Sequence, residues 1–282
     1  MTNKRLVVTL VILLFCLTCF TGYKLLSIKI EDDKALEEYQ SYSGELYFKE
    51  PTSDNQSGTD VNPTEVSEED RIREIYAEQI KIQKGINWNT FKKTNPDFIG
   101  ILSIPEMDIW YPVVQNHEEE YSYYLNHTYS GEKNSAGAIF LDYLFDPDLA
   151  DNHSIIFGHN MKNMTMFGAL RSLIENEWNH KMYVYFYTDE QVLVYRTFSA
   201  YLTSPDSTVY YAQLPEDYYA TYYEDAISNA QYLSVDKEVE DAYANMNNFL
   251  TLSTCHASDH SDYTVVQNIL IERIIVKDEE NI

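Results

Sequence analysis

Cys255 is the residue in this sequence best placed to act as a nucleophile. It ends the β-prone run Thr-Leu-Ser-Thr-Cys at residues 251–255 and is followed by a polar loop. The other two of the three cysteines, Cys16 and Cys19, lie in an apolar N-terminal run, so Cys255 has no disulfide partner in the rest of the chain. A thiol attacks well only as a thiolate and needs a basic neighbour for that. Cys255 is therefore either a buried, inert residue or a catalytic nucleophile with a histidine partner.

Seven histidines compete for the role of that partner. His256 is adjacent to Cys255, so on a strand its side chain would point to the opposite face. His159 follows the strand-like residues 154–157 and Gly158, which gives it the same kind of rigid platform as the cysteine. His260 lies in the loop after Cys255 and stays a candidate. The other four have polar, loop-like surroundings and are expected at the surface: His117, His127, His153 and His180.

Three acidic residues, Asp146, Asp148 and Asp151, have a spacing that could supply calcium ligands. The glycine and the terminal glutamate of an EF-hand loop are missing, so we expect a solvated loop. No group of cysteines and histidines has the spacing of a zinc site. The sequence thus predicts chemistry by side chains alone, without a metal or another cofactor.

Short β-prone segments separated by turn residues carry these candidates. From Phe98 onward they follow one another without alternating long helices, which is typical of a barrel or a sandwich. The expected strands cover residues 100–104, 109–115, 137–142, 154–158, 182–187, 191–202, 249–255 and 264–276. The expected helices cover residues 67–85, 88–93, 165–175 and 216–229. Cys255 and His159 both stand at predicted strand ends.

The N-terminal segment has the composition of a membrane anchor. Lys4 and Arg5 precede an uncharged run, residues 6–23, that is about as long as a helix crossing a bilayer. No small-residue cleavage site follows, which favours an uncleaved anchor over a secretory signal that is removed. The basic residues before the run favour a cytoplasmic N-terminus. Residues 50–67 are rich in turn-forming and polar residues and indicate a linker.

The formal net charge of -25 at pH 7 argues against nucleic acid as a partner, because proteins that bind phosphate backbones present basic faces. The chain also holds 25 tyrosines and 12 phenylalanines, enough apolar bulk for a core. The acidic excess is therefore expected on the surface of a folded domain.

Two motifs resemble those of the sortases, the cysteine transpeptidases of Gram-positive bacteria. Residues 251–255 look like the Thr-Leu-x-Thr-Cys motif of that family. Residues 155–162, Ile-Ile-Phe-Gly-His-Asn-Met-Lys, followed by Met166 and Phe167, resemble the histidine segment of class B sortases. Residues 98–105, 109–115 and 137–142 add further similarity. The resemblance extends over residues 67–282.

The resemblance implies a mostly β fold with flanking helices: a closed sortase β-barrel preceded by N-terminal helices and a transmembrane anchor. The expected boundaries are a cytoplasmic N-terminus (1–5), the anchor (6–23), an extracellular spacer (24–66), the N-terminal helices (67–95) and the barrel (96–282). The protein would cross the cell membrane once, with its C-terminal catalytic domain outside.

The resemblance also implies an activity. The thiol of Cys255 would cleave a sorting motif in secreted proteins after threonine, through a thioacyl-enzyme, and the motif in class B relatives is often of the Asn-Pro-x-Thr-x kind. The acyl group would pass to an amine of a lipid-linked peptidoglycan precursor, or to a pilin lysine. His159 would donate a proton to the leaving amine and accept one from the incoming amine.

Further site residues follow from the same comparison. The family has an arginine at the start of the last strand, about ten residues after the cysteine, but Arg273 is the only arginine after Cys255. Arg273 is therefore assigned to this role, on an enlarged loop or hairpin, with a surface ion pair as the alternative. Ser253, Thr254 and Leu125 are expected to contact the substrate, although an ordinary strand hydroxyl and core packing would also explain Ser253 and Leu125.

Two other classes of protein stay open. A secreted cysteine protease would only hydrolyse, but a papain-type chain places its cysteine before its histidine, whereas His159 precedes Cys255. A non-catalytic surface scaffold would leave Cys255 buried and inert. Within the family, attachment of proteins to the wall is favoured over pilin polymerisation, because the sequence has no evident lid segment of the polymerising type.

Overall fold

Two long antiparallel strands, β6 (Gln191–Thr203) and β9 (Tyr263–Ile275), form the middle of the sheet. β-branched and aromatic residues, which prefer extended backbone, make up much of both strands. Every residue from 191 to 201 is buried. Both faces of β6 are covered, because one faces the barrel interior and the other contacts helices.

The computed structural model describes residues 2–44, 68–116, 123–176, 178, 180–211, 214–255 and 262–276. The other strands are β1 (Phe98–Ile104), β2 (Ile109–Val114), β3 (Ile139–Leu141), β4 (His153–Phe157), β5 (Tyr183–Tyr187), β7 (Tyr232–Leu233) and β8 (Phe249–Cys255). The α-helices are α1 (Thr2–Ser41), α2 (Glu68–Gly85), α3 (Trp88–Thr94), α4 (Ser172–Glu175), α5 (Tyr219–Ser228) and α6 (Lys237–Ala244). The 3-10 helices are η1 (Pro105–Met107), η2 (Tyr123–Leu125), η3 (Gly168–Arg171), η4 (Thr208–Tyr210) and η5 (Glu216–Tyr218).

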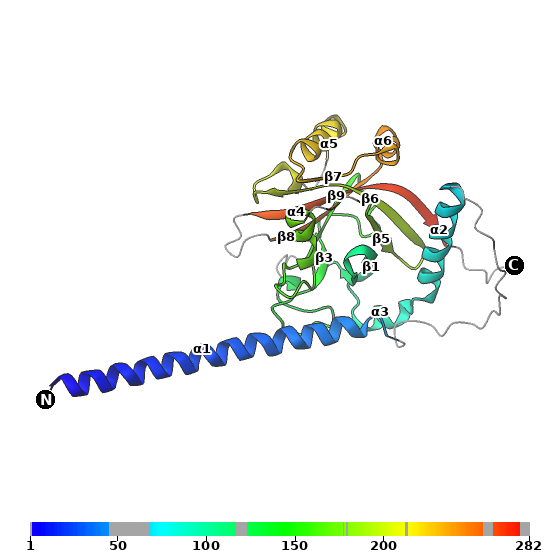
Figure 1. Cartoon of the computed structure of the whole chain (residues 1–282). Coiled ribbons are helices and arrows are strands. Elements are labelled where there is room, and N and C mark those ends of the chain that lie inside the picture. The colour runs from blue at the N-terminus through cyan, green and yellow to red at the C-terminus, as the bar shows by residue number, and fades with distance from the viewer. Residues whose placement is uncertain are drawn as a thin grey trace, which may run out of the picture.

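The sheet closes on itself. Hydrogen-bonded pairing runs in the order β5-β1-β2-β3-β4-β8-β9-β6, and β5 also pairs with β6, while the short β7 adds to β6 (Figure 1). The pairs β2–β3 and β4–β8 are parallel and the others are antiparallel. The expected fold class, a closed β-barrel with flanking helices, is confirmed.

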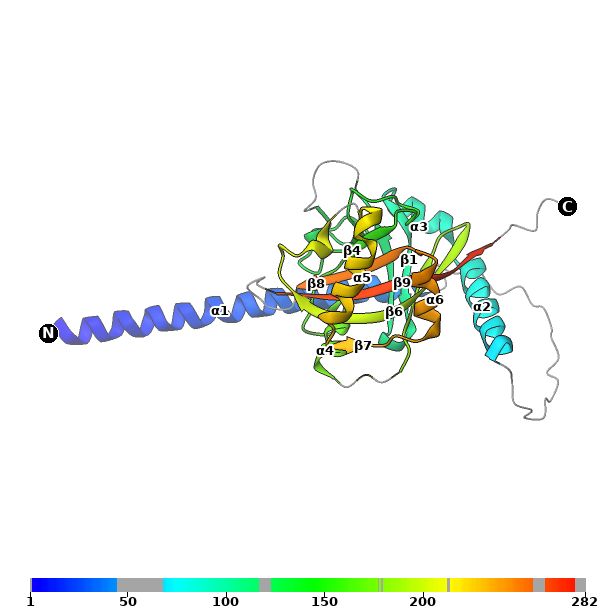
Figure 2. The same ribbon diagram turned by 90° about the horizontal axis from the view of Figure 1, so that it is seen from above.

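Two buried clusters hold the domain together. The larger one fills the barrel, and the smaller one lies between β6, β8 and β9 and the helices α5 and α6, which cross that face of the sheet in Figure 2. On another side, α2 and α3 contact the barrel: Gln83 donates to the carbonyl oxygens of Thr188 and Asp189, and the ring of Phe91 stacks on Phe98. The sheet is thus supported on several sides.

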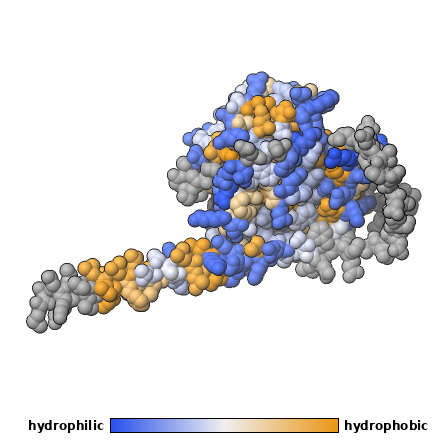
Figure 3. All heavy atoms as spheres, viewed as in Figure 1, coloured by the Kyte–Doolittle hydropathy of each residue, from blue (hydrophilic) through white to orange (hydrophobic). Residues whose placement is uncertain are grey.

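Helix α1 combines a free apolar part with a docked end. Residues 9–41 are long and apolar enough to cross a membrane, and α1 is coloured hydrophobic over most of its free length in Figure 3. At the other end Ala35, Tyr39 and Tyr42 are buried against the barrel. The first part of the expected spacer is therefore helical and packed on the domain, while residues 45–66 lie outside the described residues.

One predicted helix is shorter than expected. The pattern over residues 165–175 forms only η3 and α4, which begin at Gly168. Met164 and Met166 have positive φ angles of 67° and 53°, and this left-handed backbone cannot continue a right-handed helix. The irregular segment lies directly after His159 in the chain.

Candidate active site

The ends of β4 and β8 place two of the candidates at one edge of the sheet. The strands are parallel neighbours in which Phe157 pairs with Ser253, and the amide of Gly158 donates to the carbonyl of Ser253 at 3.2 Å. His159 and Cys255 each come two residues later. Neighbouring strands lie about 5 Å apart, so the backbones that carry the imidazole and the thiol end side by side.

His159 is half-buried and held by the chain around η2. Its Nε2 atom lies 2.7 Å from the carbonyl oxygen of Leu125. A carbonyl oxygen only accepts hydrogen bonds, so Nε2 carries a proton, and the neutral imidazole has its lone pair at Nδ1. Gly137 makes room for this ring: it has φ of 60°, and a Cβ there would lie 3.0 Å from Cδ2 of His159.

Cys255 is partly exposed at the last position of β8. Burial raises the pKa of its thiol, and the hydroxyl of Tyr263 offsets part of this rise by donating a hydrogen bond to the sulfur. Tyr263 is the first residue of β9 and pairs with Cys255. The resting group at neutral pH is therefore a thiol, which must lose its proton before it can attack.

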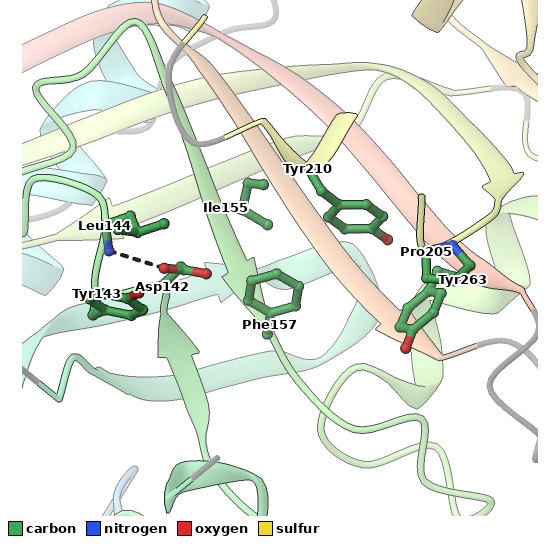
Figure 4. A pocket seen from close by; sticks show the side chains of 8 residues that line it. All are labelled: Asp142, Tyr143, Leu144, Ile155, Phe157, Pro205, Tyr210 and Tyr263. Carbon is green, nitrogen blue, oxygen red and sulfur yellow. Dashed lines mark hydrogen bonds between the residues drawn. The ribbon is translucent and has the colours of Figure 1, made fainter. Parts of the chain in front are cut away.

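A cavity of about 380 Å³ lies beside this edge of the sheet. Its aromatic wall is formed by Phe157, Tyr210 and Tyr263, seen together in Figure 4. The ring of Tyr210 stacks on Phe157 with centroids 6.2 Å apart and meets Tyr263 edge-on at 5.9 Å. The hydroxyl of Tyr210 also lies 2.9 Å from Oγ of Ser253. The cavity is large enough to take part of a peptide side chain or backbone.

Comparison with known proteins identifies the family. Residues 102–276 match the family model of the Sortase domain. Sortase B of Listeria monocytogenes is 31% identical over 191 residues, which cover 66% of this chain and 73% of that protein. The chain belongs to the class B sortases. Sortase B of Staphylococcus aureus is 24% identical over 285 residues, which cover 98% of this chain and 99% of that protein.

Solved structures agree with this assignment. The sortase B structure of Clostridium perfringens superposes with a TM-score of 0.56 at 26% identity and covers 65% of this chain and 99% of its own. Sortase B from Listeria monocytogenes has a TM-score of 0.51 at 29% identity and covers 64% of this chain and 97% of its own. As a sortase, the protein is a cysteine transpeptidase that acts on sorting signals, and sortases in general act on proteins bearing such signals and on cell-wall precursors.

Arg273 does not reach the cysteine of this sortase. It pairs with Leu193 of β6, and its guanidinium donates to Oε1 of Gln191 at 2.8 Å. Cys255 pairs with Tyr263, ten residues earlier on the same strand, and a rise of about 3.3 Å per residue puts roughly 30 Å between the two positions. The expected enlarged hairpin is replaced by a long β9, and Arg273 stands at its far end.

The three expected substrate contacts have different positions. Ser253 is buried and faces the aromatic wall through Tyr210. Thr254 is also buried, but alternation along β8 points its side chain away from the face that carries Ser253 and Cys255. Leu125 acts through its main chain, as the acceptor for His159. Of the three, Ser253 and Leu125 lie at the site.

The described histidines other than His159, and the acidic loop at residues 146–151, lie away from the pairing of β8 with β9 at Cys255. His153 was expected at the surface, but this is wrong, because it begins β4 and is 1% exposed. His127 stacks on Tyr123, and His180 is exposed. His117, His256 and His260 lie outside the described residues. Asp146 and Asp151 accept hydrogen bonds from amides of their own loop, those of Asp148 and Asp146 respectively.

Sequence reasoning missed the aromatic wall. Tyr210 lies in a connection whose place over Phe157 follows only from the fold. Tyr263 had a usable signal, because it directly precedes the strand-like residues 264–276. Among the described residues, no group of three or more His, Cys, Asp or Glu side chains is arranged to hold a metal ion.

Proposed function

We propose that Cys255 and His159 carry out the transpeptidation. The observation that supports this most directly is the parallel register of β4 and β8, in which Phe157 pairs with Ser253 and both candidates follow at the same edge. The thiol stands at a partly exposed strand end beside a cavity, as a nucleophile requires.

The substrate in this proposal is a secreted protein with a sorting motif of the Asn-Pro-x-Thr-x type. The thiol proton passes to Nδ1 of His159 while the sulfur attacks the threonine carbonyl, and the carbonyl electrons move onto oxygen. The tetrahedral intermediate collapses, the C–N bond breaks, and the imidazolium protonates the leaving amine. An amine of a cell-wall precursor then attacks the thioester and gives its proton to the imidazole. The C–S bond breaks, and the imidazolium returns the proton to the departing sulfur, which restores the thiol of Cys255.

The cellular arrangement belongs to the same proposal. Helix α1 crosses the cell membrane once, residues 1–5 stay in the cytoplasm, and the barrel works outside. The length and hydropathy of residues 9–41 support the crossing, and the basic residues Lys4 and Arg5 support the orientation. Labelling intact cells with a membrane-impermeant maleimide tests it: Cys255 should react without permeabilisation, and protection until the cells are opened would contradict it.

Turnover of a fluorogenic Asn-Pro-x-Thr-x peptide by the full chain in detergent tests the chemistry. Cys255→Ala should remove all activity and His159→Gln should lower it by about 10²–10⁴-fold, the contribution of a general acid and base. Mass spectrometry should find the acyl group on Cys255 when no amine is supplied. Retained turnover in Cys255→Ala would contradict the proposed role of Cys255.

The choice of acceptor separates the possible outcomes of the reaction. The same assay is run with a wall-type amine, with a lysine-containing pilin peptide and with water alone. Faster release with the wall-type amine, together with a joined product, supports wall attachment. Joining only to the lysine peptide would assign polymerisation instead, and release at one rate in all three arms would indicate a protease.

A further inference from the structure

The described structure places the polar side chain of Tyr263 against the thiol of Cys255. It pairs with Cys255 across β8 and β9, and its hydroxyl hydrogen-bonds the sulfur. Its ring is only partly buried and lines the cavity next to Tyr210. Figure 4 shows its ring beside the cavity, on the same side as Tyr210 and Phe157. It can therefore face both the sulfur and a bound peptide.

None of the arginines takes that position. Arg71 and Arg73 are exposed on α2, Arg171 pairs with Glu175, Arg196 is buried beside Glu238, and Arg273 is at the other end of β9. The sequence places Arg5 in the N-terminal part of α1, and the segments that the structure does not describe contain no arginine. At the start of β9, where the resemblance implies an arginine, the sequence has Tyr263.

We propose that Tyr263 is a catalytic residue of this sortase, a neutral hydrogen-bond donor that serves first the sulfur of Cys255 and then the oxyanion of the substrate carbonyl. The proposal rests on the proposed function of Cys255. A phenol has one O–H to donate, whereas a guanidinium has five N–H groups in a fixed fork. The donor at this site is therefore weaker and carries no charge.

The O–H of Tyr263 can donate a hydrogen bond in each step of the reaction without giving up its proton. As the thiol proton moves to His159, the O–H of Tyr263 stabilises the thiolate. When sulfur bonds to the carbonyl carbon, the negative charge moves to the adjacent oxygen, and the same O–H donates to it. The oxyanion then reforms the carbonyl as the amine leaves, and Tyr263 keeps its proton throughout. Burial raises the pKa of Tyr263 above its ordinary value, so the phenol remains protonated and able to donate at neutral pH.

Three variants of the full chain test this role. Tyr263→Phe keeps the ring and removes only the hydroxyl, Tyr263→Arg supplies a different donor, and the control Tyr211→Phe removes a hydroxyl from an exposed tyrosine of the neighbouring connection. The measurements are kcat and KM for the sorting peptide, and the rate of iodoacetamide alkylation of Cys255 against pH, read on the Cys255 peptide by mass spectrometry.

We expect kcat of Tyr263→Phe to fall by about 10²-fold with little change in KM, as for loss of one oxyanion donor. The midpoint of its alkylation profile should move to higher pH, because the hydrogen bond that lowers the thiol pKa is gone. Tyr263→Arg should recover much of the activity. If the ring were needed only for packing, the opposite result would follow: Tyr263→Phe would keep its activity and Tyr263→Arg would lose it.

Wild-type kcat in Tyr263→Phe, or an unshifted alkylation midpoint, would overturn the role of Tyr263. If Tyr263→Phe does not fold, Tyr263→Arg decides: turnover within about tenfold of wild type supports a donor, and a loss as complete as that of Cys255→Ala overturns it. Cys255→Ala with full activity would instead refute the proposed function itself, so the two failures are distinguishable.

Discussion

At the scale of single residues, burial decides which groups of this sortase carry protons. Burial raises the pKa of Cys255, with a partial offset from the hydroxyl of Tyr263. Burial also lowers the pKa of His153 to about 4. The first effect keeps the nucleophile protonated until a base takes its proton, and the second keeps an imidazole neutral inside the core.

The burial of His153 predicts that the folded protein loses stability in mild acid. Its Nδ1 donates to the carbonyl of Tyr211 at 3.3 Å, and its Nε2 lies 3.0 Å from Oγ1 of Thr251 and 2.9 Å from the hydroxyl of Tyr222. The pKa of His153 is about 4 in the folded protein, against an ordinary value of 6.5. Between about pH 6.5 and pH 4 the unfolded chain therefore binds a proton at this residue that the folded chain does not bind. Stability is therefore full above that pH and decreases as the pH falls towards 4.

The expected decrease is about 2 kcal/mol between about pH 7 and pH 5, from 1.36 kcal/mol per unit of pKa shift. Urea unfolding of the full chain in detergent at both values measures it. His153→Gln cannot titrate, so its stability should be lower at pH 7 but should change much less between the two values. Equal acid sensitivity in both proteins would show that other groups cause it.

Residue identities at the site were only partly predictable. Cys255 and His159 could be placed at strand ends because short local patterns mark where strands stop. Arg273 could not be placed, because its distance from Cys255 depends on how much of the intervening chain is strand and how much is loop. His153 was misjudged because the polar residues before it hide the start of a buried strand.

At the scale of elements, most strands could be predicted because their residues prefer extended backbone and turn residues separate them. The pairing order could not, since β4 meets β8 and β6 meets β9 across long stretches of chain. The helix α6 was also missed: its eight residues, Lys237–Ala244, give a short pattern that is mostly polar. In the folded protein it packs on the sheet through Val239 and Ala242, and its first turn faces one buried charge.

That charge is Arg196, in the middle of β6, with a side chain that is 0% exposed. Its Nη2 lies 3.8 Å from Asp236, the N-cap of α6, and its Nε lies 3.6 Å from Glu238, while these acids are 29% and 27% exposed. The double variant Asp236→Asn/Glu238→Gln should destabilise the domain by about 3–5 kcal/mol, because it removes both carboxylates that form ion pairs with a buried cation.

Arg196→Met is the matched comparison for that double variant. It removes the cation and keeps an apolar side chain of similar length, and both acids can still contact water, with Lys181 2.8 Å from Asp236. Its cost should be clearly smaller, and denaturant midpoints of the two proteins measure the difference. A cost for Arg196→Met equal to or above that of the double variant would contradict this account of α6 docking.

At the scale of the whole molecule, the helix that is long and apolar enough to cross a membrane also reaches the surroundings of the site. Helix α1 continues without a break from its apolar part through a charged part to Ser41, and this end packs on the barrel. The hydroxyl of Tyr39 donates to the carbonyl of Gly137 at 2.6 Å and accepts from the amide of Tyr129 at 3.2 Å. Gly137 in turn lies beside the ring of His159, since a Cβ added to it would come within 3.0 Å of Cδ2. The sequence predicted an anchor but not the docking, because the docked residues lie among charges.

Loss of the Tyr39 ring should release the end of α1. In the full chain, trypsin cleavage after Lys34, which is exposed on the docked turn, reports this release, since an undocked helix opens more easily. Tyr39→Ala removes a buried aromatic side chain, a change that costs about 3–5 kcal/mol in a core, so cleavage should become at least tenfold faster. Tyr39→Phe loses two hydrogen bonds, each worth about 1 kcal/mol, so its rate of cleavage should lie between those of the wild type and Tyr39→Ala.

Tyr23→Ala is the control, because Tyr23 is 71% exposed on the free part of α1 and its loss should leave cleavage unchanged. Turnover of the same variants then links the anchor to the chemistry. If docking holds Gly137 against the imidazole, Tyr39→Ala should turn over more slowly than Tyr23→Ala while Cys255 is alkylated at the same rate. Unchanged cleavage in Tyr39→Ala would mean that the helix end is not held by this contact, and slower turnover would then need another cause.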